Sequence, residues 1–370
     1  MGFSLLLKIS KKNLLYKKFN NIKQLMILWL APMDWITDLP CRVITKKIFN
    51  KYNNNSNNEL RLRSEFMTSD WFLACPENVV KNIINTPYEF PIILQIFWWN
   101  KTKLMGTALK IQDLYWDKIA WIELNTGCPA NNIMKSGGWS TLMKDKKRTL
   151  EIIKNISERL SIPFSIKSRT GLDNIDKNRH LEFLIEASNY CNKISVHSRT
   201  LKELYHWEWD RDFIYKLKSK ANKKCKIIWN WAIKSYKEIQ SKSCKDWVML
   251  DGIMVWQAAI GNPRIFTNHE PTVYEKIETA IEHLKLSAKF EIYLQSLKDN
   301  RKEKIYPNLE EIENINLEKK IDNVYYTPLT FRKYFHQYVK WIPGGKEAKE
   351  QCNKTNKLWD IIVILQNLKE

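Results

Sequence analysis

The chain has 370 residues, 44% of them hydrophobic and 27% charged, with a formal net charge of +20. This length and composition predict a globular protein with one large core and a smaller second one, and no apolar run reaches the roughly 18 residues that a membrane span needs. The positive charge favours RNA or DNA as a partner, although the abundance of Lys, Asn and Ile is also what a low-GC coding bias produces.

The N-terminal region and the cysteines bear on location. No acidic residue precedes Asp34, and we interpret residues 1–24 as a basic extension because they lack the Arg and Ser enrichment of a transit peptide. The seven cysteines are odd in number and form no Cys-x-x-Cys pair. That pattern is typical of reduced thiols and not of a disulfide framework or a zinc site. We therefore expect a cytoplasmic protein that binds no metal and does not enter a membrane.

Short apolar runs recur along the first two thirds of the chain, separated by segments with helical spacing of apolar residues. The predicted strands are 26–31, 64–67, 91–97, 119–124, 163–167, 193–197, 226–229 and 251–255. Segments such as 145–160 and 209–220 are predicted helices. Eight alternations of strand and helix predict a (β/α)8 TIM barrel over residues 25–266, whose chemistry lies at the C-terminal ends of the strands.

The composition changes after Phe266. Residues 273–298 and 308–320 are charged and helical, and 331–340 has the pattern of an amphipathic helix. Its apolar face holds Phe331, Tyr334, Phe335 and Tyr338, and its other face holds Arg332, His336 and Lys340. We interpret residues 267–370 as a smaller, all-helical C-terminal domain.

Candidate catalytic residues gather at the predicted strand ends. Asn125-Thr126-Gly127-Cys128-Pro129 follows the fourth strand, and Pro129 would expose the Cys128 thiol on a rigid turn. A lone cysteine in such a place is usually inert. However, Lys167 and His197 end two further strands, and convergence of Cys, Lys, His and Asn at one barrel mouth is what an active site requires.

From Leu30 to about Lys349 the chain resembles the tRNA-dihydrouridine synthase family. The stretches that carry the resemblance are LAPMDWITDLPCR (30–42), LQIF (94–97), IELNTGCPANNIMKSGGWSTLM (122–143), SIKSRTG (165–171), ISVHSRTLKELY (194–205), IIWNWAI (227–233), IMVWQAAIGNPRIF (253–266) and FRKYFHQYVKWIPG (331–344). The resemblance implies an FMN-binding barrel with a helical domain that helps to grip tRNA. NADPH would reduce the FMN, which in turn reduces the C5=C6 bond of a flipped-out uridine.

The resemblance also implies residue roles. Cys128 would be the general acid that protonates C5 of the uracil. Cofactor contacts would come from Pro32, Met33, Gln95, Lys167, His197, Asn230, Trp231, Trp256 and Gln257, the last of which stands where many relatives carry Arg. Substrate contacts would come from Asn125, Arg199, Arg332, His336 and Lys340. We expect the protein to act as a monomer.

The tryptophan content is unusual. The chain has 16 Trp and 10 Gly, whereas average usage predicts roughly 26 glycines at this length. Nine tryptophans fall where the family that the chain resembles has glycine: Trp35, Trp98, Trp121, Trp139, Trp207, Trp229, Trp231, Trp256 and Trp341. We interpret them as glycines encoded by UGA and conventionally translated as tryptophan. The alternative is a degenerate paralogue that has lost its flavin.

Two other functions compete with this interpretation. One is an FMN-barrel reductase that acts on a free pyrimidine. The basic charge and the helical domain argue against this function. The other is a non-catalytic tRNA-binding paralogue. Flavin absorbance of the purified protein would distinguish an enzyme from the latter.

Overall fold

The computed structural model describes residues 26–53, 58–74, 80–98, 100–127, 142–203, 210–231, 233–299 and 306–369. The predicted basic extension, Cys128, Trp139 and Trp207 lie outside these ranges. None of the helices in the described part of the chain combines the length and the apolar character of a membrane span.

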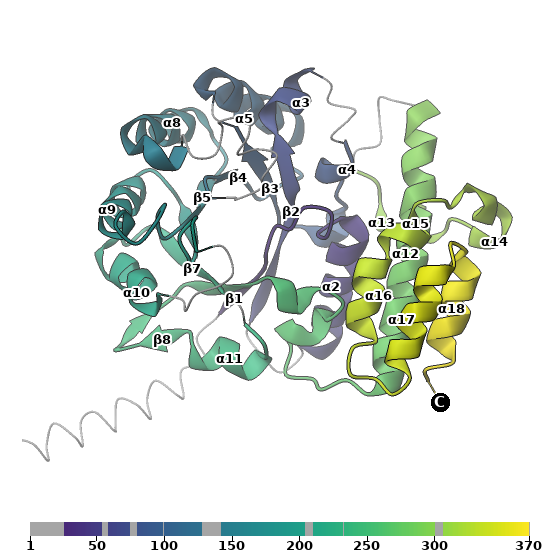
Figure 1. Ribbon diagram of the computed structural model, residues 1–370. Coiled ribbons are helices and arrows are strands. Elements are labelled where there is room, and N and C mark those ends of the chain that lie inside the picture. The colour runs from purple at the N-terminus through teal and green to yellow at the C-terminus, as the bar shows by residue number, and fades with distance from the viewer. Residues whose placement is uncertain are drawn as a thin grey trace, which may run out of the picture.

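Eight parallel strands close into a barrel in the order β1-β10-β7-β6-β5-β4-β3-β2 (Figure 1). The strands are β1 (Ile27–Leu30), β2 (Glu59–Thr68), β3 (Ile92–Phe97), β4 (Trp121–Asn125), β5 (Phe164–Arg169), β6 (Lys193–His197), β7 (Lys226–Trp231) and β10 (Gly252–Val255). Helices surround the barrel: α2 (Leu39–Tyr52), α3 (Ser69–Ala74), α4 (Val80–Ile83), α5 (Lys101–Tyr115), α8 (Lys146–Arg159), α9 (Lys177–Ala187), α10 (Arg211–Lys220) and α11 (Tyr236–Ser241). The predicted (β/α)8 barrel is confirmed.

Local sequence signals fix where these helices begin. The side chains of Asp38, Asn100, Asp145, Asp210 and Ser235 each accept a hydrogen bond from the backbone N–H three residues further on. Short polar side chains at this position satisfy an N–H group that the helix itself leaves unpaired. The caps therefore set the first turn of five barrel helices.

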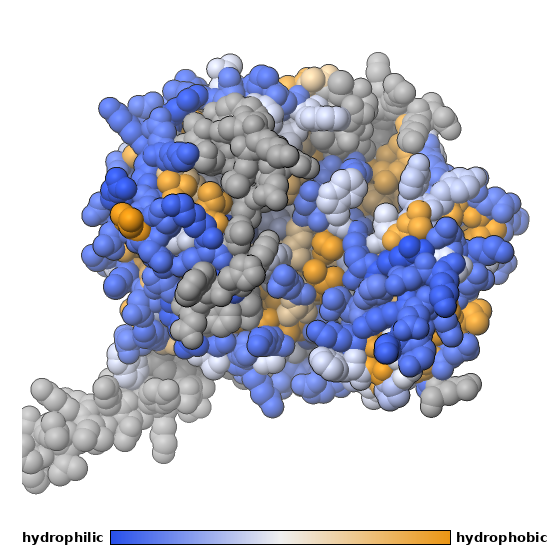
Figure 2. Space-filling model, viewed as in Figure 1, coloured by the Kyte–Doolittle hydropathy of each residue, from blue (hydrophilic) through white to orange (hydrophobic). Residues whose placement is uncertain are grey.

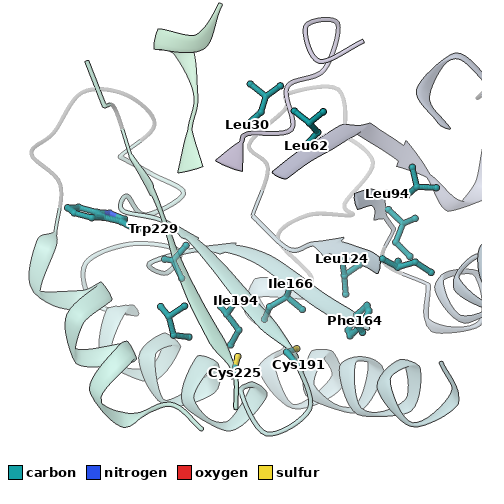
Figure 3. Packing of buried hydrophobic residues seen from close by; sticks show 14 of the residues in the cluster. Leu30, Leu62, Leu94, Leu124, Phe164, Ile166, Cys191, Ile194, Cys225 and Trp229 are labelled. Atoms are coloured by element: carbon teal, nitrogen blue, oxygen red, sulfur yellow. The ribbon is translucent and has the colours of Figure 1, made fainter. Parts of the chain in front are cut away.

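The core has two layers with different chemistry. Apolar side chains that point outward from the strands pack under the helices; Figure 3 shows Leu30, Leu94, Leu124, Ile166 and Ile194 in this layer. The inward-pointing side chains are partly polar. Arg63 and Glu123 are completely buried inside the barrel, and they form an ion pair with 2.7 Å between Arg63 Nε and Glu123 Oε1. A buried charge of this kind persists only when it is paired and hydrogen-bonded.

The C-terminal region is helical, as predicted. It comprises α12 (Val273–Asp299), α13 (Leu309–Glu313), α14 (Leu317–Lys320), α15 (Thr327–Thr330), α16 (Arg332–Tyr338), α17 (Gly345–Lys354) and α18 (Leu358–Gln366). The helical character predicted for 308–320 is divided between two short helices, α13 and α14. Helix α13 ends at Glu313, and the Asn316 side chain accepts a hydrogen bond from the Lys319 N–H at the start of α14. The helix is interrupted here because Asn favours caps over helix interiors.

The amphipathic helix near 331–340 is confirmed as α16. Tyr334, Phe335 and Tyr338 are buried, and the His283 ring of α12 lies among Phe331, Tyr334 and Tyr338. The Tyr334 hydroxyl donates to the Ile36 carbonyl beyond β1. This contact joins the helical region to the mouth of the barrel, where the two lie side by side in Figure 1.

The backbone at some tryptophans is of a kind that bulky residues seldom adopt. In the described ranges, the non-glycine residues with positive φ are Trp35 (62°), Asp246 (47°), Trp247 (68°) and Trp341 (64°). Asp246 and Trp247 form the two-residue turn between strands β8 (Cys244–Lys245) and β9 (Val248–Met249). Positive φ at both central residues of such a turn is the conformation for which Asp-Gly is preferred.

Other tryptophans among the nine have an ordinary strand backbone. Trp121 and Trp229 lie within strands β4 and β7. The Trp229 indole is fully buried in the outer layer, as Figure 3 shows, 5.9 Å from the Tyr215 ring centroid, and it donates to the Ser198 hydroxyl. It points away from the barrel interior because alternate residues of a strand face opposite sides of the sheet.

Candidate active site

A cavity of about 360 Å³ opens at the C-terminal ends of the barrel strands. Its size is typical of pockets for small molecules and cofactors. The predicted site residues that line it are Pro32, Met33, Asn125, Lys167, His197, Asn230, Trp256 and Gln257. The structure thus brings together residues from four strands, β4 to β7, and from the loops that follow β1 and β10. Figure 2 shows the surrounding surface, which is mainly hydrophilic, with small hydrophobic groups between the barrel and the helical region.

His197 is held by a neighbouring strand. Its Nδ1 lies 3.1 Å from Asn230 Oδ1, and Asn230 Nδ2 donates to the Met254 carbonyl at 3.3 Å. Burial, followed by the positive charges of Arg169 and Lys167, lowers the pKa of His197 well below its usual range. The imidazole is therefore neutral, and its buried Nε2 has no hydrogen-bond partner within the described protein.

Basic side chains from β5 line the same cavity. Lys167 and Arg169 are two residues apart on one strand and so point to the same side of it. Arg169 donates from Nε to the Gly127 carbonyl at 2.7 Å and from Nη1 to the Thr200 carbonyl at 3.0 Å. Sequence reasoning missed Arg169, although its spacing from Lys167 was a signal that would have found it.

A chain of buried amides leads down from the cavity. Asn125 Nδ2 donates to Gln95 Oε1 at 2.9 Å, and Gln95 Nε2 donates to Glu123 Oε1 at 2.9 Å. Gln95 is 1% exposed and lies outside the residues that line the cavity. The structure places it one layer below the mouth, and its predicted cofactor contact stays a prediction.

The remaining predicted residues lie elsewhere. Arg199 follows β6, and its carbonyl accepts from the Thr170 N–H at 3.2 Å, but it is not among the residues that line the cavity. Cys128 lies outside the described residues, directly after Gly127, which does line the cavity. The side chain of Trp231 is also outside the described part.

Of the three residues predicted to contact tRNA in the helical region, Arg332 and His336 lie on α16, and Lys340 follows its end. Arg332 Nη2 donates to the Thr355 carbonyl at 3.0 Å and to Asn356 Oδ1 at 2.9 Å. His336 Nε2 lies 3.1 Å from Asn353 Oδ1. Arg332 thus ties α16 to the segment before α18 and is only partly available to a ligand. Lys340 is exposed, with its Nζ 5.3 Å from the centroid of the Trp341 ring.

A buried acidic group precedes Phe66, a residue of β2 that lines the cavity. Glu65 on β2 is 5% exposed, and Asn82 Nδ2 donates to its Oε2 at 3.2 Å. Burial, with the nearby charges of Asp38 and Asp34, raises the pKa of Glu65 to about 7. Glu65 therefore titrates near neutral pH, and no sequence motif had singled it out.

Comparison with known proteins identifies the family. Residues 29–354 match the family model described as dihydrouridine synthase. The chain is 26% identical over 278 residues to a probable tRNA-dihydrouridine synthase of Rickettsia conorii, covering 72% of this chain and 79% of that protein. It is 25% identical over 329 residues to tRNA-dihydrouridine synthase B of Pseudomonas putida, covering 88% and 86%. A tRNA-dihydrouridine(20/20a) synthase of Haemophilus ducreyi is 25% identical over 275 residues, covering 69% and 78%. The chain belongs to the dihydrouridine synthase family.

Proposed function

We propose that this protein is a tRNA-dihydrouridine synthase that reduces the C5=C6 bond of uridines in tRNA. The family match over residues 29–354 carries the proposal, and the cavity that joins Asn125, Lys167 and His197 supports it. We further propose FMN as the cofactor, NADPH as the reductant, a cytoplasmic location and a monomeric enzyme.

The cavity has the features that a flavin needs. His197 offers a buried acceptor, Nε2, that lacks a partner in the described protein, and a buried polar atom of this kind favours a ligand with a hydrogen-bond donor. Lys167 and Arg169 supply positive charge. The residues proposed to hold FMN are Pro32, Met33, Gln95, Lys167, His197, Asn230, Trp231, Trp256 and Gln257. Bound FMN would supply the electrons for reduction of the uracil.

The chain itself would orient the uracil and deliver a proton. Asn125 lines the cavity and would hydrogen-bond the base. Cys128 would donate its thiol proton to C5, which needs a general acid on the side opposite the cofactor. Arg169 donates to the carbonyl of Gly127, the residue before Cys128, and would help to position it. Arg199 would contact the tRNA.

The helical region would grip the tRNA backbone. The net charge of +20 suits a polyanion. Lys340 is exposed on α16's C-terminal side, whereas Arg332 and His336 also make hydrogen bonds within the protein. We propose that all three contribute to tRNA binding, with Lys340 as the residue whose charge is most accessible.

We also propose that several tryptophans are glycines in the native protein. Trp35 and Trp341 have positive φ and are 65% and 88% exposed, so little burial of the indole compensates for the backbone conformation. Trp247, which the comparison with family glycines did not include, has the same feature in a turn that prefers Asp-Gly. UGA codons read as glycine would explain all three.

One set of measurements tests this function. The purified protein should be yellow, NADPH should bleach its flavin, and unmodified tRNA should restore the colour. A free pyrimidine that restores the colour as well as tRNA does would support the alternative reductase. A colourless protein that binds tRNA would support the non-catalytic paralogue.

A further inference from the structure

The buried ion pair Arg63–Glu123 lies one layer below the cavity, and neither residue lines the cavity. Both side chains are 0% exposed. Arg63 donates from Nε to Glu123 Oε1 at 2.7 Å and from Nη2 to Glu123 Oε2 at 2.9 Å, and Nη2 also donates to Ser195 Oγ at 2.9 Å. Replacing a buried ion pair of this kind with apolar residues of similar volume is often neutral for stability, so its presence calls for another reason.

Glu123 begins a chain of hydrogen bonds that has only one possible direction. The charge of Arg63 and its hydrogen bond overcome the effect of burial and bring the pKa of Glu123 down to about 2, so the carboxylate is ionised. An ionised carboxylate can only accept hydrogen bonds. The Gln95 atom that faces it, at 2.9 Å, must therefore be the amide nitrogen.

The direction passes from one amide to the next. With its nitrogen on Glu123, Gln95 offers its oxygen to Asn125, whose nitrogen lies 2.9 Å away. Asn125 then turns its oxygen toward the Gly127 N–H at 3.0 Å. Reversing any one amide would bring two N–H groups face to face, and a buried donor without an acceptor is strongly unfavourable. Glu123 at one end of the chain and the Gly127 N–H at the other thus both determine which end of the Asn125 amide donates and which accepts.

Amide polarity distinguishes the pyrimidine bases. Uracil has carbonyl acceptors at positions 2 and 4 with an N–H between them, whereas cytosine has an amino donor at position 4. An asparagine of fixed polarity that suits uracil meets donor against donor, or acceptor against acceptor, when cytosine takes the same place. We propose that Arg63 and Glu123 are positioning residues that make the site selective for uracil over cytosine by fixing the polarity of Asn125.

The inference rests on the proposed role of Asn125 in binding the target base. It adds that the selectivity originates in residues that do not touch the base. The same hydrogen-bond chain also includes the Gly127 N–H and so orients the residue that precedes Cys128. If the orientation of the Asn125 amide is no longer fixed, both the selectivity for uracil and the rate of uridine reduction should fall.

Two double variants form a matched test. Arg63→Met/Glu123→Met removes the ion pair and the acceptor that faces Gln95. Arg63→Met/Glu123→Gln removes the same charges but keeps a carbonyl oxygen that can accept from Gln95 Nε2. The two proteins differ by one carboxamide group, with its carbonyl acceptor and NH2 donor, at nearly constant volume. All variants are made in the chain that carries the native residues at the disputed tryptophan positions.

The first readout is binding by the flavin-free protein. It compares the dissociation constant for a tRNA whose uridine the wild-type protein reduces with that for the same tRNA carrying cytidine there. We expect a preference of roughly tenfold for uridine in the wild-type protein, almost none in the Met/Met variant, and recovery of most of it in the Met/Gln variant. In single turnover with chemically reduced flavin, the Met/Met variant should be slower by about 10²-fold, as for a misplaced reacting group.

Gln95→Met breaks the chain at its next link while leaving the ion pair intact, and it replaces the double variants if they do not fold. It should lose the uridine preference as the Met/Met variant does. Equal preferences in the two double variants, or a wild-type preference in Gln95→Met, would overturn the inference. A wild-type protein that reduces uridine but binds both tRNAs equally would also overturn it, whereas failure of the wild-type protein to reduce any tRNA uridine would contradict the proposed function itself.

Discussion

His197 donates the proton on Nδ1 to Asn230 Oδ1, 3.1 Å away, because the Asn230 amide nitrogen is already committed to the Met254 carbonyl. Asn230 therefore keeps the neutral imidazole in the tautomer that presents Nε2 as an acceptor. The cavity wall thus contains an acceptor whose direction is set by the adjacent strand.

This relationship predicts the effect of Asn230→Leu. Without the amide oxygen, His197 is free to move its proton and to rotate, and the acceptor is no longer fixed. We expect the dissociation constant for FMN to rise roughly tenfold, the equivalent of one buried hydrogen bond. Flavin fluorescence titration of the apoprotein measures it. Asn189→Leu on the outer surface is the control, and an equal rise in both variants would refute the assignment.

Glu65 predicts a dependence of stability on pH. Its pKa is raised from 4.5 to about 7 in the folded protein by burial and by Asp38 and Asp34, so the folded state favours the protonated form. The stabilisation is fully present below the unfolded pKa and is lost as pH rises through about 7. The loss amounts to about 3 kcal/mol at alkaline pH.

Glu65→Gln should remove that dependence while keeping the carbonyl that accepts from Asn82. Urea unfolding at several pH values between about 4 and 9 compares the two proteins. The variant should gain stability relative to wild type as pH rises. Parallel pH profiles for the two proteins would show that Glu65 does not carry the raised pKa.

Residues of α16 and its C-terminal end predict a change in the salt dependence of tRNA binding. Lys340→Ala should lower the slope of log affinity against log salt by about one unit, the effect of one lost phosphate contact, without changing stability. Arg332→Ala should also lower the slope, but it removes hydrogen bonds to Thr355 and Asn356 and should destabilise the fold as well. Flavin content should not change. Lys224→Ala, before β7, is the control. If all three variants show the same salt slope, Arg332 and Lys340 do not contact phosphate and α16 has only a structural role.

The tryptophan interpretation predicts glycine in the native protein at most of Trp35, Trp98, Trp121, Trp139, Trp207, Trp229, Trp231, Trp256 and Trp341. The structure adds Trp247. Replacing Trp35, Trp247 and Trp341 by Gly should each stabilise the fold by about 1 kcal/mol, because a side chain at positive φ costs about that much. Peptide mass spectrometry of the native protein gives the residues directly. Tryptophan at these three positions would refute the recoding and favour a degenerate paralogue.

The barrel was predictable because most of its strands appear in the sequence as short apolar runs, whose outward-facing side chains pack under the helices. β2 was the exception. Only 64–67 was predicted of Glu59–Thr68, since Arg61 and Arg63 interrupt the apolar pattern that identifies a strand and the register shifts between Arg63 and Phe66. Polar residues inside a barrel look like surface residues in a sequence, and only their ion pairs reveal that they are buried.

The sequence predicted which strand ends supply the site residues. It did not predict the depth in the barrel at which each side chain lies. Sequence position places Gln95, Asn125 and His197 near the ends of their strands. The register pairs Gln95 with Glu123 but Asn125 with Lys167. This stagger puts Gln95 below the cavity and Asn125 in its wall. Stagger depends on how the strands tilt around the whole barrel, which no single segment encodes.

The most direct test of the proposed function is the chemical analysis of tRNA incubated with the protein, FMN and NADPH. Nucleoside mass spectrometry should find dihydrouridine in tRNA that initially lacked it. Cys128→Ala should retain flavin and still oxidise NADPH, but it should form dihydrouridine about 10²–10⁴ times more slowly, because it lacks the general acid. Unmodified uridine after incubation with a flavin-loaded wild-type protein would contradict the account.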